Sequence, residues 1–149
     1  MSSEHILARL RRFLLLLSVG LCAGIALELA LTGHTQTPMQ FVPFVLCGLG
    51  ALVAALVLFA PSRSSIIALR VVMLLSLLGG AFGVFEHLEE NVEFAMEIKP
   101  AQTQAAPLAA ALSGANPPLA PGALGAGALI ALAAVYAHPA AGGSKRRGA

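Results

Sequence analysis

The chain alternates between long apolar runs and shorter polar segments. Each run is about 20 residues long, and a helix of that length covers roughly 30 Å, the thickness of the hydrocarbon core of a bilayer. The runs occupy residues 13–32, 41–60, 66–85 and 119–137. The pattern predicts an all-α fold, an integral membrane four-helix bundle with these four segments as its spans. Gly and Ala dilute the fourth run, which gives the weakest signal.

Composition supports this interpretation. The 149 residues suit one domain, with 58% hydrophobic and only 11% charged residues. A soluble domain carries about 25% charged residues, so this chain lacks the polar side chains to cover a water-facing surface. The first run exceeds the apolar stretch of a secretory signal, about 7 to 15 residues, and no small-residue cleavage site follows it. We therefore expect an uncleaved anchor.

The basic residues predict the orientation. With four spans, eight of the nine basic residues fall on one side, and Lys99 alone falls on the other. The eight are Arg9, Arg11, Arg12, Arg63, Arg70, Lys145, Arg146 and Arg147. Because short loops rich in Lys and Arg stay in the cytoplasm, both termini should be cytoplasmic in a bacterial inner membrane. Residues 1–12 would be an N-terminal tail and residues 138–149 a disordered basic tail. These charges serve topology, so we expect the lipid bilayer, and no nucleic acid, as a partner.

Residues 86–118 form the second outer segment, and they hold most of the acidic residues. All seven acids of the chain are Glu, and five of them lie between residues 86 and 97. On a helix, one face would carry Glu86, Glu90, Glu93 and Glu97, and another would carry Phe85, Leu88, Val92, Ala95 and Met96. We predict that the third helix continues beyond the bilayer as an acidic amphipathic helix. A Pro- and Ala-rich loop would then lead to the fourth span.

The same segment supports an alternative interpretation, a cation site. His87, Glu86 and Glu90 offer one imidazole and two carboxylates within a single turn. One turn of helix seldom closes a metal site, so His34 from the first outer loop would have to join them. The identity of the metal stays unknown at this stage.

Two series of small residues suggest how the helices pack. Gly20, Gly24 and Glu28 lie four residues apart in the first span, and Gly79, Gly83 and His87 do so in the third. Small residues at this spacing let membrane helices approach closely. Counted from the arginine before each helix, the two series reach the same depths. We therefore hypothesise a parallel glycine seam between these helices, with Glu28 and His87 paired near its outer end, because a charged group in a span requires a partner.

Little in the sequence indicates cofactor chemistry. Cys22 and Cys47 fall at different depths of their predicted spans, so we expect no disulfide and two small, buried, apolar-like side chains. The histidines do not lie at matched depths on neighbouring helices, as paired haem ligands would. No phosphate-binding, zinc-protease or hydrolase motif occurs. We expect no cofactor and no enzymatic activity.

Two classes of function remain open. The first is a non-enzymatic accessory subunit that binds a membrane-protein partner, with the acidic helix as its docking surface. The second is a small transporter, or a proton- or metal-responsive protein, that uses Glu28 and His87. Since four helices are few for a complete transport pathway, the second class would require a homo-oligomer.

Overall fold

A computed structural model describes residues 2–142, and within them the chain forms helices and turns but no strand. The long helices are α1 (Ser3–Leu31), α2 (Val42–Phe59, preceded by the 3-10 turn Pro38–Phe41) and α3 (Arg63–Ile98). These three are long and apolar enough to cross a membrane. The all-α prediction is therefore confirmed for the described residues, together with three long apolar helices.

A fourth apolar helix completes the bundle. It is α6 (Leu119–Ala134), which has 16 residues and is shorter than the predicted span of residues 119–137. Two short helices, α4 (Pro100–Ala105) and α5 (Pro107–Ser113), connect α3 to α6. A final 3-10 turn covers Pro139–Ala141. The basic residues of the predicted C-terminal tail, Lys145, Arg146 and Arg147, lie outside the described residues.

Two boundaries differ from the prediction. Helix α1 begins at Ser3, so residues 3–12, which we expected to form a tail, are helical. Helix α3 does not end at residue 85 but continues unbroken to Ile98. Its 36 residues span about 54 Å at 1.5 Å per residue, far more than a bilayer core requires. The acidic segment is therefore part of the same rod as the third apolar run.

Helix α3 begins at a serine pair. Ser62 Oγ accepts a hydrogen bond from the backbone N–H of Ser65 at 3.1 Å, and Ser65 Oγ accepts one from the N–H of Ser62 at 2.9 Å. This capping box satisfies two of the donors that a helix start leaves unpaired. Because Ser62 caps the helix, the turn after α2 can be very short, and α2 and α3 pack as an antiparallel pair.

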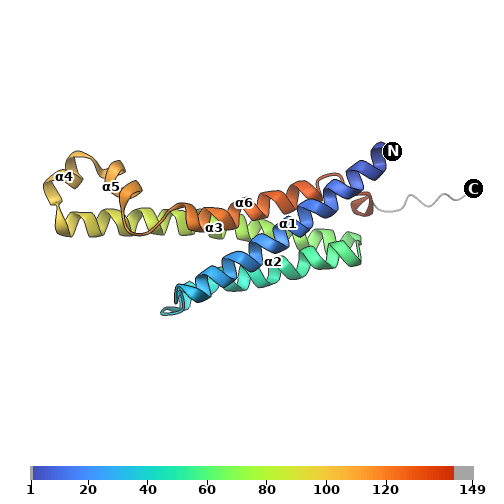
Figure 1. The fold of residues 1–149 in the computed structure, drawn as a ribbon, viewed down its shortest axis with the longest axis horizontal. Coiled ribbons are helices and arrows are strands. Elements are labelled where there is room, and N and C mark those ends of the chain that lie inside the picture. Colours follow the sequence, from blue (N-terminus) through green and yellow to red (C-terminus); the bar gives the residue numbers. More distant parts are fainter. Residues whose placement is uncertain (1, 143–149) are drawn as a thin grey trace, which may run out of the picture.

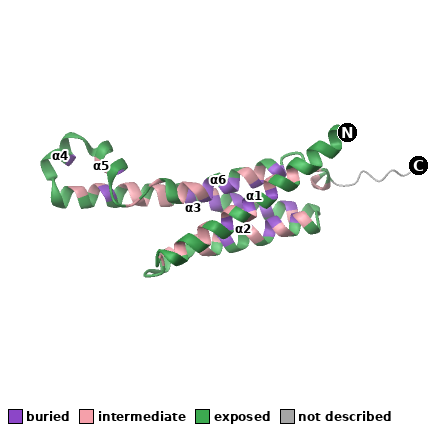
Figure 2. Ribbon diagram, viewed as in Figure 1, coloured by how far each residue is buried: buried purple, intermediate pink, exposed green. Residues whose placement is uncertain are grey.

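The four apolar helices pack in a ring in the order α1, α2, α3, α6 (Figure 1). Each helix contacts its two neighbours in this ring, whereas α1 and α3 lie on a diagonal, and no Cα atom of one lies within 8 Å of a Cα atom of the other. The main core occupies the end of the bundle where α1 begins and α6 ends (Figure 2). Its larger members are Leu15, Val53, Val57, Ile66, Leu69, Met73 and Val135.

The outer surface of the ring is also apolar. Large side chains point outward from each of the four helices, among them Phe13, Leu16, Leu52, Val71, Leu78 and Leu129. A helix that is apolar on all sides is typical of a membrane span or of the centre of a large protein. The outer surface is therefore compatible with a membrane protein.

The predicted glycine seam between the first and third helices is wrong. Gly20 and Gly24 lie on the exposed face of α1, and no atom lies within 4 Å of the position that a Cβ on either would take. Gly79 faces Leu46 of α2. The diagonal arrangement keeps α1 and α3 apart, and the two glycines of α3 face different neighbours, Gly79 toward α2 and Gly83 toward α6.

The close helix approach occurs between α3 and α6 instead. A Cβ on Gly80 would lie 3.0 Å from both the carbonyl oxygen of Pro121 and the backbone nitrogen of Gly125. A Cβ on Gly83 would lie 2.8 Å from the Cβ of Pro121. Only glycine leaves room for the α6 backbone at these positions, so Gly80 and Gly83 define the seam of the bundle.

Two arginines hold the end of α6. The Arg11 guanidinium donates to the carbonyl oxygen of Ala137 at 2.6 Å, and that of Arg70 donates to the carbonyl oxygen of Val135 at 3.0 Å. The last carbonyls of a helix have no partner within the helix, and they carry partial negative charge. These arginines, which the sequence suggested as topology signals, therefore also cap α6 from two neighbouring helices.

Candidate functional site

The part of the molecule that projects from the bundle is the best-defined candidate site. We call residues 86–117 the head: the end of α3, helices α4 and α5, and the segment that follows α5. Helix α3 extends well past the other long helices, and α4 and α5 fold back along it (Figure 1). The head is therefore a helical hairpin built on a rigid rod.

Asn91 joins the parts of the head through hydrogen bonds. Its side chain is only 2% exposed, on the face of α3 that α5 covers. The Asn91 amide nitrogen donates to the carbonyl oxygens of Ala111 and Asn116, each at 2.8 Å, and its oxygen accepts from the N–H of Asn116 at 2.9 Å. Both amide protons and the amide oxygen are thus used, which is what a buried polar group requires.

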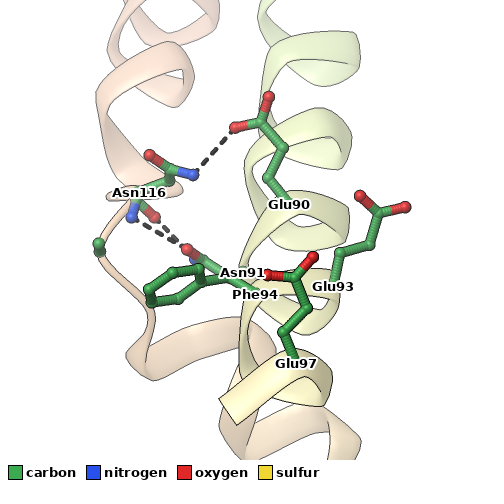
Figure 3. A pocket seen from close by; sticks show the side chains of 7 residues that line it. Glu90, Asn91, Glu93, Phe94, Glu97 and Asn116 are labelled. Atoms are coloured by element: carbon green, nitrogen blue, oxygen red, sulfur yellow. Dashed lines mark hydrogen bonds between the residues drawn. The ribbon is translucent and has the colours of Figure 1, made fainter.

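The returning segment passes very close to this side chain. A Cβ on Gly114 would overlap the amide group of Asn91. Glycine at this position lets residues 114–116 lie directly on α3, and Asn91 then reaches their backbone (Figure 3). Asn91 and Gly114 therefore form one fitted contact.

Two further hydrogen bonds extend this contact along α3. The Asn116 side chain donates from Nδ2 to Glu90 Oε2 at 2.9 Å. His87 Nδ1 lies 3.0 Å from the carbonyl oxygen of Pro117. Because a carbonyl oxygen only accepts, the imidazole donates here from Nδ1–H. One polar row on α3 thus holds the segment that leads into α6.

The predicted pair of Glu28 and His87 is therefore not formed. Glu28 lies on the exposed face of α1, whose Cα atoms all stay more than 8 Å from those of α3, and His87 of α3 turns toward Pro117 in the segment before α6. The prediction placed the two groups at similar depths, but depth alone does not bring side chains together across a diagonal.

The predicted cation site is not assembled either. Within residues 2–142, no three His, Cys, Asp or Glu side chains come together as metal ligands. His34 belongs to the turn between α1 and α2, which lies apart from the head (Figure 1). Without it, Glu86, His87 and Glu90 remain three side chains of one helix, and two of their polar groups are bonded to the loop at Asn116 and Pro117.

A pocket lies beside the Asn91 contact. It has a volume of about 360 Å³ and opens on the acidic face of α3 (Figure 3). Its lining consists of Glu90, Asn91, Glu93, Phe94, Glu97, Ala115 and Asn116. Three carboxylates, an aromatic ring and an amide make this pocket suited to a cationic group that carries an apolar stem.

A second pocket adjoins the first at Phe94 and lies between α3 and the short helices. Its volume is about 450 Å³, and it includes Ile98, Thr103, Ala106 and Ala110. Phe94 lines both pockets. The head therefore presents two adjoining pockets that share an aromatic ring, and of the two only the first is lined by carboxylates.

The sequence interpretation missed the residues that build the head. It assigned no role to Asn91, Gly114 or Asn116. A signal was nevertheless present, because Asn91 and Asn116 are the only asparagines in the chain. Asn91 also follows His87 by four residues, so the two share a face of α3. Comparison of the chain with protein-family models, with curated proteins and with solved structures finds no match.

Proposed function

We propose that the protein is a non-enzymatic accessory subunit of a bacterial inner membrane that binds a partner protein through its head. The four apolar helices would all cross the membrane, with both termini in the cytoplasm and the head on the opposite side. The observation that carries this proposal is the pocket lined by Glu90, Glu93, Glu97 and Phe94. It lies on a structure that Asn91 holds in place.

The chemistry of the pocket defines the partner. The head carries five glutamates and one basic residue, Lys99. Complementary charge steers association and selects partners, while a buried aromatic anchor supplies affinity. The expected partner is therefore a polypeptide segment with Lys or Arg beside an apolar side chain. The cation would lie among the carboxylates, and the apolar side chain would pack on Phe94.

Purification tests this proposal. The tagged protein, extracted in mild detergent, should bring down a partner in stoichiometric amount. The double variant Glu93→Lys/Glu97→Lys reverses two pocket charges and should lose that partner. The matched control is Glu86→Lys/Glu89→Lys, which makes the same charge change on the same helix but outside the pocket lining.

The outcomes separate clearly. Retention of the partner by the control and its loss by the pocket variant support the proposal. Equal loss in both variants would mean that net charge alone matters, and the absence of any stoichiometric partner would contradict the accessory role. Binding should also weaken as the salt concentration rises from 0.1 to 0.5 M. The electrostatic screening length then falls from about 10 to about 4 Å, so exposed charges attract each other less.

The proposed orientation has its own test. A reporter enzyme that works only in the cytoplasm should be active when it is fused after Ala149, whereas a reporter that requires the opposite side should be inactive there. A cysteine introduced at Glu89 should react with a membrane-impermeant reagent added outside. The alternative function, a transporter or a proton- or metal-responsive protein, relied on Glu28 and His87 acting together. That alternative has no comparable geometric support, since those two residues lie on helices whose Cα atoms stay more than 8 Å apart.

A further inference from the structure

Three buried sulfur-containing side chains belong to three neighbouring helices of the bundle. They are Cys22 of α1, Cys47 of α2 and Met73 of α3, which are 5%, 1% and 1% exposed. The two cysteines belong to one packed cluster and are free thiols that are not joined in a disulfide. The expectation that the two cysteines lie at different depths is therefore wrong.

Gly50 of α2 leaves space beside two of these side chains. A Cβ on Gly50 would lie 3.2 Å from Cys22 Sγ and 3.4 Å from the terminal methyl group of Met73. Both groups therefore approach the same position beside α2. The nearby Gly48 differs, because nothing lies within 4 Å of the position that its Cβ would take.

The other buried polar side chains of the bundle already have partners. Ser18 Oγ donates to the carbonyl oxygen of Gly127 at 3.2 Å, and Ser76 Oγ donates to that of Val72 at 3.0 Å. Neither cysteine thiol has a hydrogen bond to the backbone among the described residues, so both remain available as ligands.

Thiolate and thioether ligands select Cu(I), Zn²⁺ and iron–sulfur clusters. Structural zinc sites use four ligands from Cys, His and carboxylates, and iron–sulfur clusters use four Cys, so a set of two Cys and one Met favours Cu(I). We propose that Cys22, Cys47 and Met73 form a Cu(I) site within the bundle. Binding of Cu(I) would displace one thiol proton and form one Cu–thiolate bond. The second thiol and the Met73 thioether would act as neutral donors. The resulting site has no net charge, as apolar surroundings require.

The test is a Cu(I) titration of the full-length protein in mild detergent, reduced and without oxygen, against a coloured Cu(I) chelator. We expect one Cu(I) per chain, with an ultraviolet charge-transfer band from the Cu–thiolate bond. Cys22→Ser and Cys47→Ser should each abolish both signals. Since even outer-shell partners contribute about 10- to 100-fold to metal affinity, Met73→Leu should weaken binding by at least about tenfold.

Matched variants keep the proposal falsifiable if a cysteine variant fails to fold. Gly50→Ala removes no ligand but crowds two of them, so it should lower Cu(I) affinity, whereas Gly48→Ala should not. Met96→Leu, in the head, is the control for Met73→Leu. A reduced, helical protein that takes up no Cu(I), or equal effects of the paired variants, would overturn the site. So would a Cys22–Cys47 disulfide that forms in air while the reduced protein leaves Cu(I) with the chelator.

Discussion

The bundle and the head share helix α3, yet they are held together in opposite ways. In the bundle, Gly80 and Gly83 remove side chains so that the α6 backbone packs directly on α3. In the head, Asn91 adds a polar side chain that bonds the returning segment at three points. One continuous helix therefore packs through glycines in its apolar part and through a hydrogen-bonded asparagine in its polar part.

The reason lies in what each environment offers. Between apolar helices surrounded by lipid, burial of apolar surface does not favour protein over lipid, so close packing decides which helices meet. The head has only short helices, of six residues in α4 and seven in α5, and these cannot build a core. A saturated asparagine supplies the specificity that a core would otherwise provide.

The largest effect is expected from a change at the bundle seam. Gly80→Leu forces a side chain into the backbone of Pro121 and Gly125, and overpacking of this kind costs about 3 kcal/mol or more. Thermal unfolding in detergent should show a clearly lowered midpoint. Gly20→Leu, on the exposed face of α1, should leave the midpoint unchanged. A lowered midpoint for Gly20→Leu together with an unchanged midpoint for Gly80→Leu would instead support the seam predicted from the sequence.

The next effect should be confined to the head. Asn91→Ala leaves two carbonyl oxygens and one N–H without partners, at a cost of roughly 3 kcal/mol. Hydrogen exchange in residues 107–117 should accelerate by about 100-fold, while α1 and α2 remain protected. Glu89→Ala, on the exposed side of the same helix, is the control. Equal acceleration in the bundle would show that the two regions unfold together.

A smaller effect is expected at the end of α6, where arginine side chains donate hydrogen bonds to backbone carbonyl oxygens. Arg70→Gln removes a charged donor from the end of α6 and should lower stability by about 1.5 kcal/mol. Arg12→Gln is the control, because Arg12 is exposed and makes no hydrogen bond among the described residues. Thermal unfolding of the two variants should differ. If it does not, the cap at Val135 contributes nothing measurable.

The smallest effect concerns His138, just beyond α6. Burial lowers the pKa of His138, and the charge of Arg11 lowers it further. The unfolded chain therefore binds a proton at higher pH than the folded chain, so the contribution of neutral His138 is complete above about pH 6.5 and is lost as pH falls below it. Protonation would also remove the hydrogen bond that His138 Nδ1 accepts from the N–H of Ala140.

The difference in melting temperature between the wild type and His138→Ala should consequently shrink between pH 7.5 and pH 5.5, around the ordinary histidine pKa of about 6.5. His5→Ala, on the exposed start of α1, serves as the control. A difference that stays constant with pH, or that grows toward low pH, would contradict this account of His138.

The sequence was sufficient to predict the long apolar helices, but it predicted a loop where α4 and α5 form. Apolar runs of membrane length predicted three long helices. The spacing of the glutamates and of the apolar residues predicted that α3 continues beyond its apolar run with an acidic face. The start of α1 was missed because Arg11 and Arg12 interrupt the apolar pattern. Arginine is nevertheless a good helix former, and Arg11 finds a partner in Ala137 that lies more than 100 residues away.

The neighbours of each helix could not be predicted in this way. Periodicity shows which residues share a face, and it correctly grouped Gly20 with Gly24, but it does not show what that face meets. Cys22 and Cys47 illustrate the same limit, since apparent depths counted from loops failed to reveal that the thiols lie together. Asn91 was overlooked because one amide among many glutamates has no pattern of its own.

The arginine caps on α6 bear on how the molecule is made. Synthesis proceeds from the N-terminus, so α1, α2 and α3 leave the ribosome before α6 exists. Until then Arg11 and Arg70 lack the carbonyl oxygens of Ala137 and Val135, and the surface of α3 at Gly80 lacks its packing partner. Arrival of α6 would supply these contacts together, so we expect that a chain truncated before residue 119 cannot complete the bundle.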